Sequence, residues 1–167
     1  MTNGIFDYTN LPISNMVTQS PDKVWQLQQL THLSYTHKPN TNFAPGTSWR
    51  YSNTTYIIAG QLIKEIYRKA YGHSLTLNQI LQKQLIKPYH LQNTYYFPNH
   101  LPQPLSKRMV HGYNYYTGKD FTKYNLSIAG PSGAMIANPI AVATWIKLLL
   151  NGNIIPNKQY KELMQLD

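Results

Sequence analysis

The chain has 167 residues, and its 15 Lys and Arg against 6 Asp and Glu give a net charge of +9 with His neutral. Hydrophobic residues make up 42% and aromatic residues 13% of the sequence, which excludes a disordered chain because such chains lack the apolar surface that offsets ordering entropy. The absence of Cys excludes disulfides, thiolate zinc sites, iron–sulfur clusters and a cysteine nucleophile. No apolar run approaches the ~20 residues of a membrane-spanning helix, so we expect no membrane span.

The positive charge is scattered along the chain. Lys64, Arg68 and Lys69 form one small group, and on a helix such a group is typical of a solvated face. A phosphate-binding surface usually has a denser Lys/Arg stripe, so we expect no nucleic-acid partner. The His and the few acidic residues show no spacing of metal ligands, and we expect neither a metal nor a cofactor.

The first part of the chain is rich in turn-forming residues. We expect a loop over 1–19. Ser20-Pro21-Asp22 then predicts the start of a helix, with Ser20 as its N-cap. Pro and Asn over 38–46 predict a connecting loop.

The strongest helical pattern follows that loop and ends at Gly72, which suits a helix end. The apolar residues at helical spacing are Ile57, Ile58, Leu62, Ile63 and Ile66, and Gly60 beside them allows close packing. A second helix is predicted from Ser74 or Thr76 to Pro88. Two more are predicted, one opened by Asn138 and a short one over 156–166.

The region between these helices is aromatic and irregular. The run from Tyr113 to Lys119 is typical of a strand, a turn and a second strand. The fold class is therefore α+β and mainly α, in one partial domain over 1–167. Its parts are an opening loop (1–19), a helical region (20–88), an aromatic loop and hairpin region (89–137) and C-terminal helices (138–167).

The segment over 43–56 carries the clearest chemistry. The Pro45-Gly46 turn and a short extended piece bring Tyr51 and Asn53 to the start of the strongest helix. Because residues i and i+2 of an extended chain point to the same side, a phenol and a carboxamide would face one cleft. A phenol can exchange a proton, and a carboxamide can donate and accept hydrogen bonds. The alternative interpretation makes Tyr51 a packing residue and Asn53 the N-cap of the helix.

With its flanks, Tyr51-Ser52-Asn53 resembles the Tyr-x-Asn segment of the class C β-lactamase and D-Ala-D-Ala carboxypeptidase family of serine hydrolases. Residues 1–8 are similar to the T-S-G-I-x-D-Y stretch that lies just downstream of the nucleophile helix in that family. Further pieces match in the family's order, namely 72–75, 88–94, 111–113 and 129–135. The ordered series covers nearly the whole chain.

The resemblance implies the helical lobe of a β-lactamase/transpeptidase-like fold, with much of the sheet missing. In the family, the serine of a Ser-x-x-Lys motif attacks a carbonyl and forms an acyl-enzyme. The tyrosine of Tyr-x-Asn assists proton transfer and the asparagine contacts the amide side chain of the substrate, which makes Tyr51 catalytic and Asn53 substrate-binding here. The family's Lys/His-Thr/Ser-Gly motif has no match over 151–167, and Thr117-Gly118-Lys119 is better explained as a hairpin turn.

One Ser-x-x-Lys does occur, at Ser20 to Lys23, but it follows the stretch that it should precede. We interpret Ser20 as a helix cap and assign no nucleophile in this chain. Without the lysines of the two missing motifs, Tyr51 should stay a neutral phenol. We therefore expect the chain alone to hydrolyse neither β-lactams nor D-Ala-D-Ala peptides.

The resemblance implies a peptidoglycan stem peptide or a β-lactam as ligand, and a periplasmic or secreted location. No signal peptide opens the chain, which leaves a cytoplasmic location open. A truncated or split reading frame would explain the missing motifs, and an uncovered apolar face would then favour a complementing chain or self-association.

Two other functions stay open. The first is a non-catalytic module that binds peptidoglycan peptides through Tyr51 and Asn53. The second is a basic protein that binds an anionic polymer. Within the family, the sequence does not separate a β-lactamase from a carboxypeptidase or an esterase, because pockets outside the shared motifs set that choice.

Overall fold

The structure is a computed structural model that describes residues 1–96, 103–122 and 124–165. The chain forms two compact units, of which unit 1 comprises Met1–Leu77 and Phe97–Ala134, and unit 2 comprises Asn78–Tyr96 and Met135–Asp167. Helices predominate in the described residues, whose strands form one two-stranded sheet. The predicted fold class, mainly α with a small β part, is confirmed.

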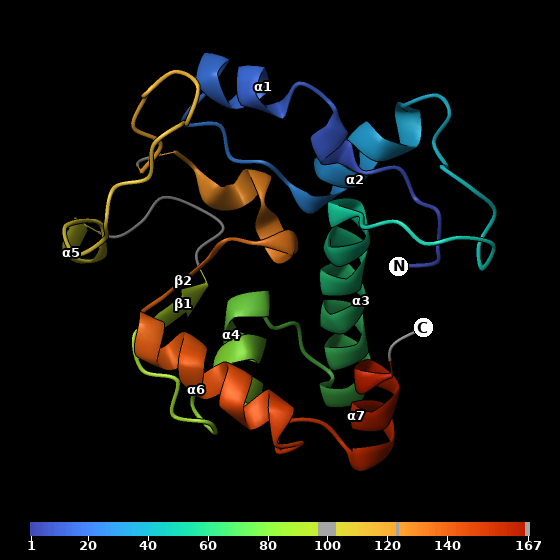
Figure 1. Cartoon of the computed structure of the whole chain (residues 1–167), viewed down its shortest axis with the longest axis vertical. Helices are drawn as coiled ribbons and strands as arrows, with labels where there is room; N and C mark the ends of the chain where they lie inside the picture. The colour runs from blue at the N-terminus through green and yellow to red at the C-terminus, as the bar shows by residue number, and fades with distance from the viewer. Residues whose placement is uncertain (97–102, 123, 166–167) are drawn as a thin grey trace. The chain divides into compact units, whose positions relative to one another are not determined.

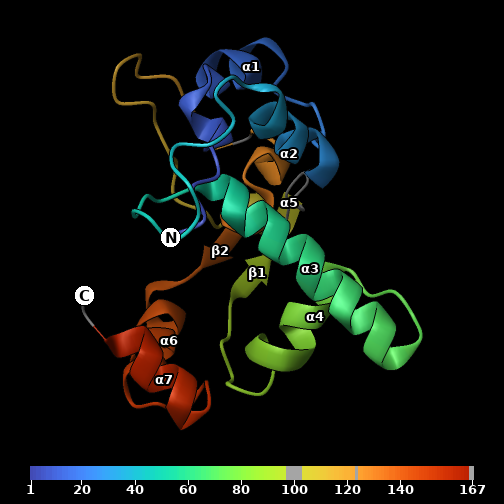
Figure 2. The same ribbon diagram turned by 90° about the vertical axis from the view of Figure 1, so that its right-hand side faces the viewer.

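Unit 1 is built around the first turns of its longest helix, α3 (Asn53–Tyr71). The helix α2 (Leu27–Thr36) packs against α3 near that end, as Figures 1 and 2 both show. Tyr8, Trp25, Leu30 and Ile57 form the buried core at this point. The remaining elements of unit 1 are η1 (Tyr8–Asn10), α1 (Ile13–Gln19), α5 (Gln103–Ser106), η3 (Leu126–Ile128) and η4 (Gly130–Ser132).

Two predictions for the N-terminal region are wrong. The expected loop over 1–19 contains the helix α1, and Ser20 follows this helix as its C-cap residue, with its N–H donating to the carbonyl of Met16 at 3.2 Å. Ser20 is therefore not the N-cap of the next helix. That helix, α2, begins at Leu27 and is capped by reciprocal side-chain bonds of Gln26 and Gln29.

Tertiary contacts explain why the helix does not start at Ser20. The backbone N–H of Trp25 donates to Ser127 Oγ at 2.7 Å, and the carbonyl of Pro21 accepts from the N–H of Asn125 at 3.2 Å. These bonds hold the chain before α2 against the segment at 125–127, and the indole of Trp25 enters the core. This tertiary packing overrides the local helix-start signal at Ser20-Pro21.

The helix α3 confirms the strongest sequence prediction. It ends at Gly72, which adopts the left-handed conformation with φ 70°. Gly60 allows the predicted close packing, because a Cβ at this position would lie 2.4 Å from Pro131 Cγ in η4. The predicted apolar stripe is buried at Ile57, whereas Leu62 and Ile66 are 58% and 54% exposed. We call the exposed part of the stripe, Ile58, Leu62, Ile63 and Ile66, the α3 apolar face.

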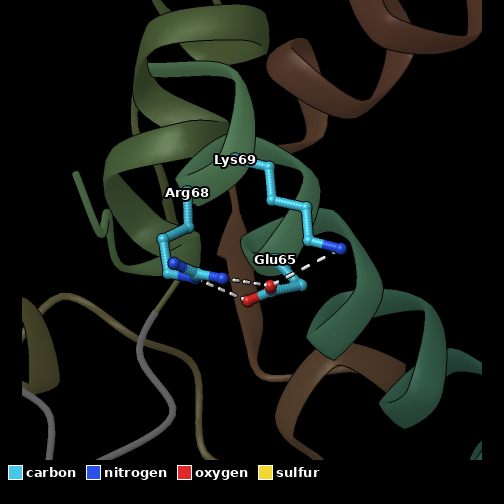
Figure 3. Close-up of polar contacts among 3 residues, drawn as sticks. All are labelled: Glu65, Arg68 and Lys69. Atoms are coloured by element: carbon cyan, nitrogen blue, oxygen red, sulfur yellow. Dashed lines mark hydrogen bonds and ion pairs between the residues drawn. The ribbon is translucent and has the colours of Figure 1, made fainter. Parts of the chain in front are cut away.

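The last turns of α3 carry the basic group that the sequence places on a solvated face. Figure 3 shows Glu65 between the two cations, with Arg68 Nη2 2.5 Å and Lys69 Nζ 4.0 Å from Glu65 Oε1. The hydrogen bond from Arg68 holds the pKa of Glu65 below its usual value. Because Glu65 neutralises part of the positive charge, this group does not form a run of unpaired cations of the kind that follows a phosphate backbone.

Unit 2 contains a small sheet and the C-terminal helices. The helix α4 (Leu77–Leu81) continues as a π-helical turn, η2 (Gln82–Ile86), which agrees with the predicted second helix. The strands β1 (Thr94–Tyr96) and β2 (Met135–Ala137) pair antiparallel. The helices α6 (Pro139–Leu150) and α7 (Asn157–Met164) follow, as predicted, although the predicted end of the last helix at residue 166 lies outside the described residues.

The strands do not lie where the sequence predicts them. The run from Tyr113 to Lys119 is a tight loop closed by one antiparallel bridge between Tyr113 and Asp120, and not a pair of strands. Asn114 Oδ1 accepts from two backbone N–H groups inside this loop, and backbone bonds of Asn114 with Gly118 and Lys119 close it. None of the helices in the described part of the chain is long and apolar enough to cross a membrane.

We predict that the isolated chain self-associates through the α3 apolar face, because this face leaves several large aliphatic side chains in water. Sedimentation velocity should show concentration-dependent association that the double substitution Leu62→Gln and Ile66→Gln abolishes. Tyr35→Gln, at a residue of α2 that is 70% exposed, is the matched control and should leave association unchanged. A wild-type chain that sediments as a monomer at every concentration would contradict this prediction.

Candidate functional site

Residues 1–7, which we call the N-terminal arm, run beside the segment that leads to Tyr51. An antiparallel bridge joins Ile5 to Thr41, and the backbone N–H of Arg50 donates to the carbonyl of Met1 at 3.0 Å. Gly4 has φ +69°, and a Cβ there would lie 2.1 Å from the carbonyl oxygen of Phe43. Only glycine permits this close approach, so the two segments that resemble family motifs lie side by side in unit 1.

Tyr51 and Asn53 lie on the same side of a short extended piece. Ser52 between them is extended, with φ −148° and ψ 119°, and is buried. Tyr51 is 46% exposed, and its hydroxyl donates a long hydrogen bond of 3.4 Å to Asn53 Oδ1. The phenol and the carboxamide therefore face outward together, as the alternation of an extended chain predicts.

Asn53 is not the N-cap of α3. It is the first residue of the helix, and Ser52 occupies the N-cap position without a side-chain capping bond. Asp7 of the arm caps the helix instead, because its Oδ2 accepts from the backbone N–H of Asn53 at 3.0 Å. A carboxylate is well suited to this place, since the first N–H groups of a helix have no partner within the helix and the dipole favours negative charge there.

The carboxylate of Asp7 also holds the side chain of Asn53. Its Oδ2 accepts from Asn53 Nδ2 at 2.9 Å, and its Oδ1 accepts from the backbone N–H and the hydroxyl of Thr9, both at 2.9 Å. Asn53 Nδ2 donates in addition to Thr9 Oγ1 at 3.1 Å. Asp7 is a site residue that the sequence does not single out, although it lies in the stretch that resembles the family and is one of only 6 acidic residues in the chain.

The next two residues of α3 are bound to the arm as well. Thr54 Oγ1 accepts from the N–H of Tyr8 at 3.0 Å and donates to the carbonyl of Phe6 at 2.9 Å. Asn3 Nδ2 donates to Thr55 Oγ1 at 2.9 Å. The first turn of α3, which presents Asn53, is thus fixed by the arm at each of its first three residues.

The electrostatics of Tyr51 favour the neutral phenol. Partial burial, with the neighbouring Tyr56 and Asp7, raises the pKa of Tyr51 above its usual value. A phenol that acts as a base near neutral pH needs the opposite, a nearby positive charge that lowers its pKa. Burial and the neighbouring groups therefore favour the protonated phenol of Tyr51.

Ser20 and Lys23 do not form the geometry of a nucleophile pair. Both are exposed and lie in the non-helical segment between α1 and α2. Lys23 Nζ lies 3.6 Å from the ring centroid of Trp25, so its charge rests on an aromatic face. A working pair needs both side chains one helical turn apart in a buried place where lysine can lose its proton.

An acid–base pair that the sequence did not reveal lies in the loop over 113–120 and its flanks. His111 Nδ1 lies 2.6 Å from Asp120 Oδ2. Hydrogen bonds from the side chain and the backbone of Thr122, with that of His111, lower the pKa of Asp120 to about 2. The pair is exposed and braces the two ends of the loop. Among the described residues, no group of three His, Asp or Glu is arranged to hold a metal ion.

Two hollows occur away from Tyr51 and Asn53. The one in unit 1, about 460 Å³, lies between α1 and the loop over 113–121. The one in unit 2, about 520 Å³, is mainly apolar and lies between β1, β2 and the start of α6. Tyr51 and Asn53 do not line either of these two hollows.

Comparison with known proteins decides the family. The sequence model of the β-lactamase family matches residues 8–166. The chain belongs to the β-lactamase family. The resemblance drawn from the motifs is confirmed, and the fold matches that of solved β-lactamase-like serine hydrolases.

Three solved structures illustrate the relationship. The D-stereospecific amidohydrolase from Streptomyces sp. is 26% identical with a TM-score of 0.82, over 99% of this chain and 49% of that one. The D-amino acid amidase from Ochrobactrum anthropi SV3, complexed with L-phenylalanine, is 25% identical with a TM-score of 0.74, over 95% and 42%. The penicillin binding protein from Bacillus halodurans shares the fold, with 16% identity and a TM-score of 0.71 over 98% and 48%. The chain thus spans less than half the length of each of these three proteins.

We predict that Tyr51 titrates above the usual phenol value of ~10, because burial and the nearby Asp7 disfavour the phenolate. An NMR titration of isotopically labelled tyrosine should show this midpoint, with the signal assigned by its loss in Tyr51→Phe. A midpoint below ~10 would reveal a positive charge beside the phenol and contradict the neutral-phenol account.

Proposed function

We propose that this chain supplies one wall of the acyl-transfer pocket of a serine hydrolase that cleaves an amide bond next to a D-amino acid. Peptides ending in D-Ala-D-Ala, β-lactams and D-amino acid amides share this chemistry. The observation that supports the proposal is the outward-facing pair of Tyr51 and Asn53 at the start of α3, with Tyr51 Oη 3.4 Å from Asn53 Oδ1. In the β-lactamase family these two positions belong to the Tyr-x-Asn motif.

Each side chain has a defined task in this proposal. Tyr51 passes a proton between the attacking hydroxyl and the leaving nitrogen, and Asn53 holds the amide group of the substrate. The attacking serine and the lysine that would lower the pKa of the phenol come from residues outside this sequence. The phenol of Tyr51 is neutral without them, so the chain alone has no route to an acyl-enzyme.

Two similar proteins support the proposal that the substrate contains a D-residue. Two of the similar proteins, at 26% and 25% identity, are a D-stereospecific amidohydrolase and a D-amino acid amidase. The family and the resemblance to D-Ala-D-Ala carboxypeptidases suggest peptidoglycan stem peptides and β-lactams as further ligands, and a periplasmic or secreted location. A partner chain that carries the Ser-x-x-Lys motif would complete the pocket.

A non-catalytic peptide-binding module is the second candidate. The exposed Tyr51 and the partly exposed Asn53 favour it, because the pair can contact a ligand without any nucleophile. The two candidates differ in turnover, which only the hydrolase shows once the missing motifs are supplied.

We predict that the chain binds D-phenylalanine amide more tightly than L-phenylalanine amide, and that Asn53→Ala weakens this binding about tenfold, as expected for the loss of hydrogen bonds to a partly buried amide. Tyr51→Phe should weaken it less, because the ring stays. Chemical-shift titration measures all three. Equal binding of the two enantiomers, or binding unaffected by Asn53→Ala, would contradict the proposal.

The same preparation should not hydrolyse nitrocefin or a D-Ala-D-Ala peptide. Ser20→Ala is the control for this expectation, because Ser20 begins the one Ser-x-x-Lys in the sequence. Turnover that disappears in Ser20→Ala would show that Ser20 is a nucleophile and would overturn the assignment of the missing groups to residues outside this chain.

A further inference from the structure

We propose that Asp7 is the positioning residue of this site, and that it fixes which atoms of the Asn53 carboxamide face the substrate. The inference rests on the proposed function of Tyr51 and Asn53. Asp7 is only 5% exposed, so little of its carboxylate is open to a ligand. It acts through Asn53, whose backbone and side chain it binds at 3.0 Å and 2.9 Å.

The chemistry of a carboxylate determines the orientation. An ionised carboxylate only accepts hydrogen bonds, so the group of Asn53 that faces Asp7 must be its NH₂. The oxygen Oδ1 is then turned to the other side, where it accepts from the hydroxyl of Tyr51 at 3.4 Å. A neutral residue in place of Asp7 would not enforce this choice, because an amide can either donate or accept.

The two N–H groups of Asn53 are held unequally. The bond from Nδ2 to Asp7 Oδ2 is partly buried, at 2.9 Å, whereas the bond to Thr9 Oγ1 is exposed and longer, at 3.1 Å. A substrate carbonyl can replace Thr9 without disturbing the bond to Asp7. Asn53 therefore presents one replaceable donor and one oxygen with a free lone pair, a pattern that matches the C=O and N–H of a peptide-like amide.

The charge of Asp7 is compensated within the network. Four N–H or O–H groups donate to its two oxygens, two from Thr9 and two from Asn53. The positive end of the α3 dipole lies beside it, since Asn53 is the first residue of that helix. These four hydrogen bonds to the carboxylate oxygens hold Asn53 in one orientation.

The test uses hydrogen exchange of the Asn53 side-chain NH₂ by NMR, with Asp7→Asn as the main variant. Asp7→Asn keeps the size of the side chain but leaves one oxygen for four donors. We expect the Asn53 side-chain protons to exchange about tenfold faster, and the affinity for D-phenylalanine amide to fall by a similar factor, while the unfolding transition still shows a folded chain. The control variant Asp120→Asn removes a carboxylate in the loop over 113–120. It should change neither the exchange rate nor the affinity.

The two readouts separate the two proposals. If the wild-type chain does not bind D-phenylalanine amide, the proposed function fails, and the exchange measurement still tests Asp7. If the Asn53 side-chain protons of the wild type exchange as fast as those of the exposed Asn151, or if Asp7→Asn leaves their exchange unchanged, Asp7 does not position Asn53. Asp7→Ala, which removes every acceptor, should exceed the effect of Asp7→Asn, and a smaller effect would also overturn the inference.

Discussion

The site depends on a buried carboxylate at the N-terminus of a helix. Asp7 accepts from the first backbone N–H of α3 and from the side chain of its first residue, so one group both starts the helix and orients Asn53. The N-terminal arm brings Asp7 to the start of α3, because Gly4 lets the backbone of the arm pass close to Phe43. A short polar segment thus organises the part of the molecule that carries the Tyr-x-Asn motif.

The sequence predicts well where local signals and packing agree. The periodic pattern and Gly72 give α3, and Asn138 caps α6 as expected, with Oδ1 accepting from the N–H of Ala141 at 2.7 Å. The spacing of Tyr51 and Asn53 predicts that their side chains share one side. These features depend on neighbouring residues, and so a single sequence suffices for them.

The failures are all non-local. Ser20-Pro21 has the composition of a helix start, but bonds to the segment at 125–127 keep the following residues out of a helix. The strands β1 and β2 pair residues that are far apart in the chain, such as Tyr95 and Ile136, while the local hairpin pattern gives only a bridged loop. The role of Asp7 could not be predicted from local patterns, because its partner, Asn53, lies 46 residues further along the chain.

A crystal structure of this chain grown with D-phenylalanine amide tests most directly whether Tyr51 and Asn53 bind a ligand together. We expect ligand density within hydrogen-bonding distance of Asn53 and beside the ring of Tyr51, with the contact between Asp7 and Asn53 Nδ2 intact. A Tyr51 ring folded into the core, or an Asn53 side chain turned away from Asp7, would contradict it.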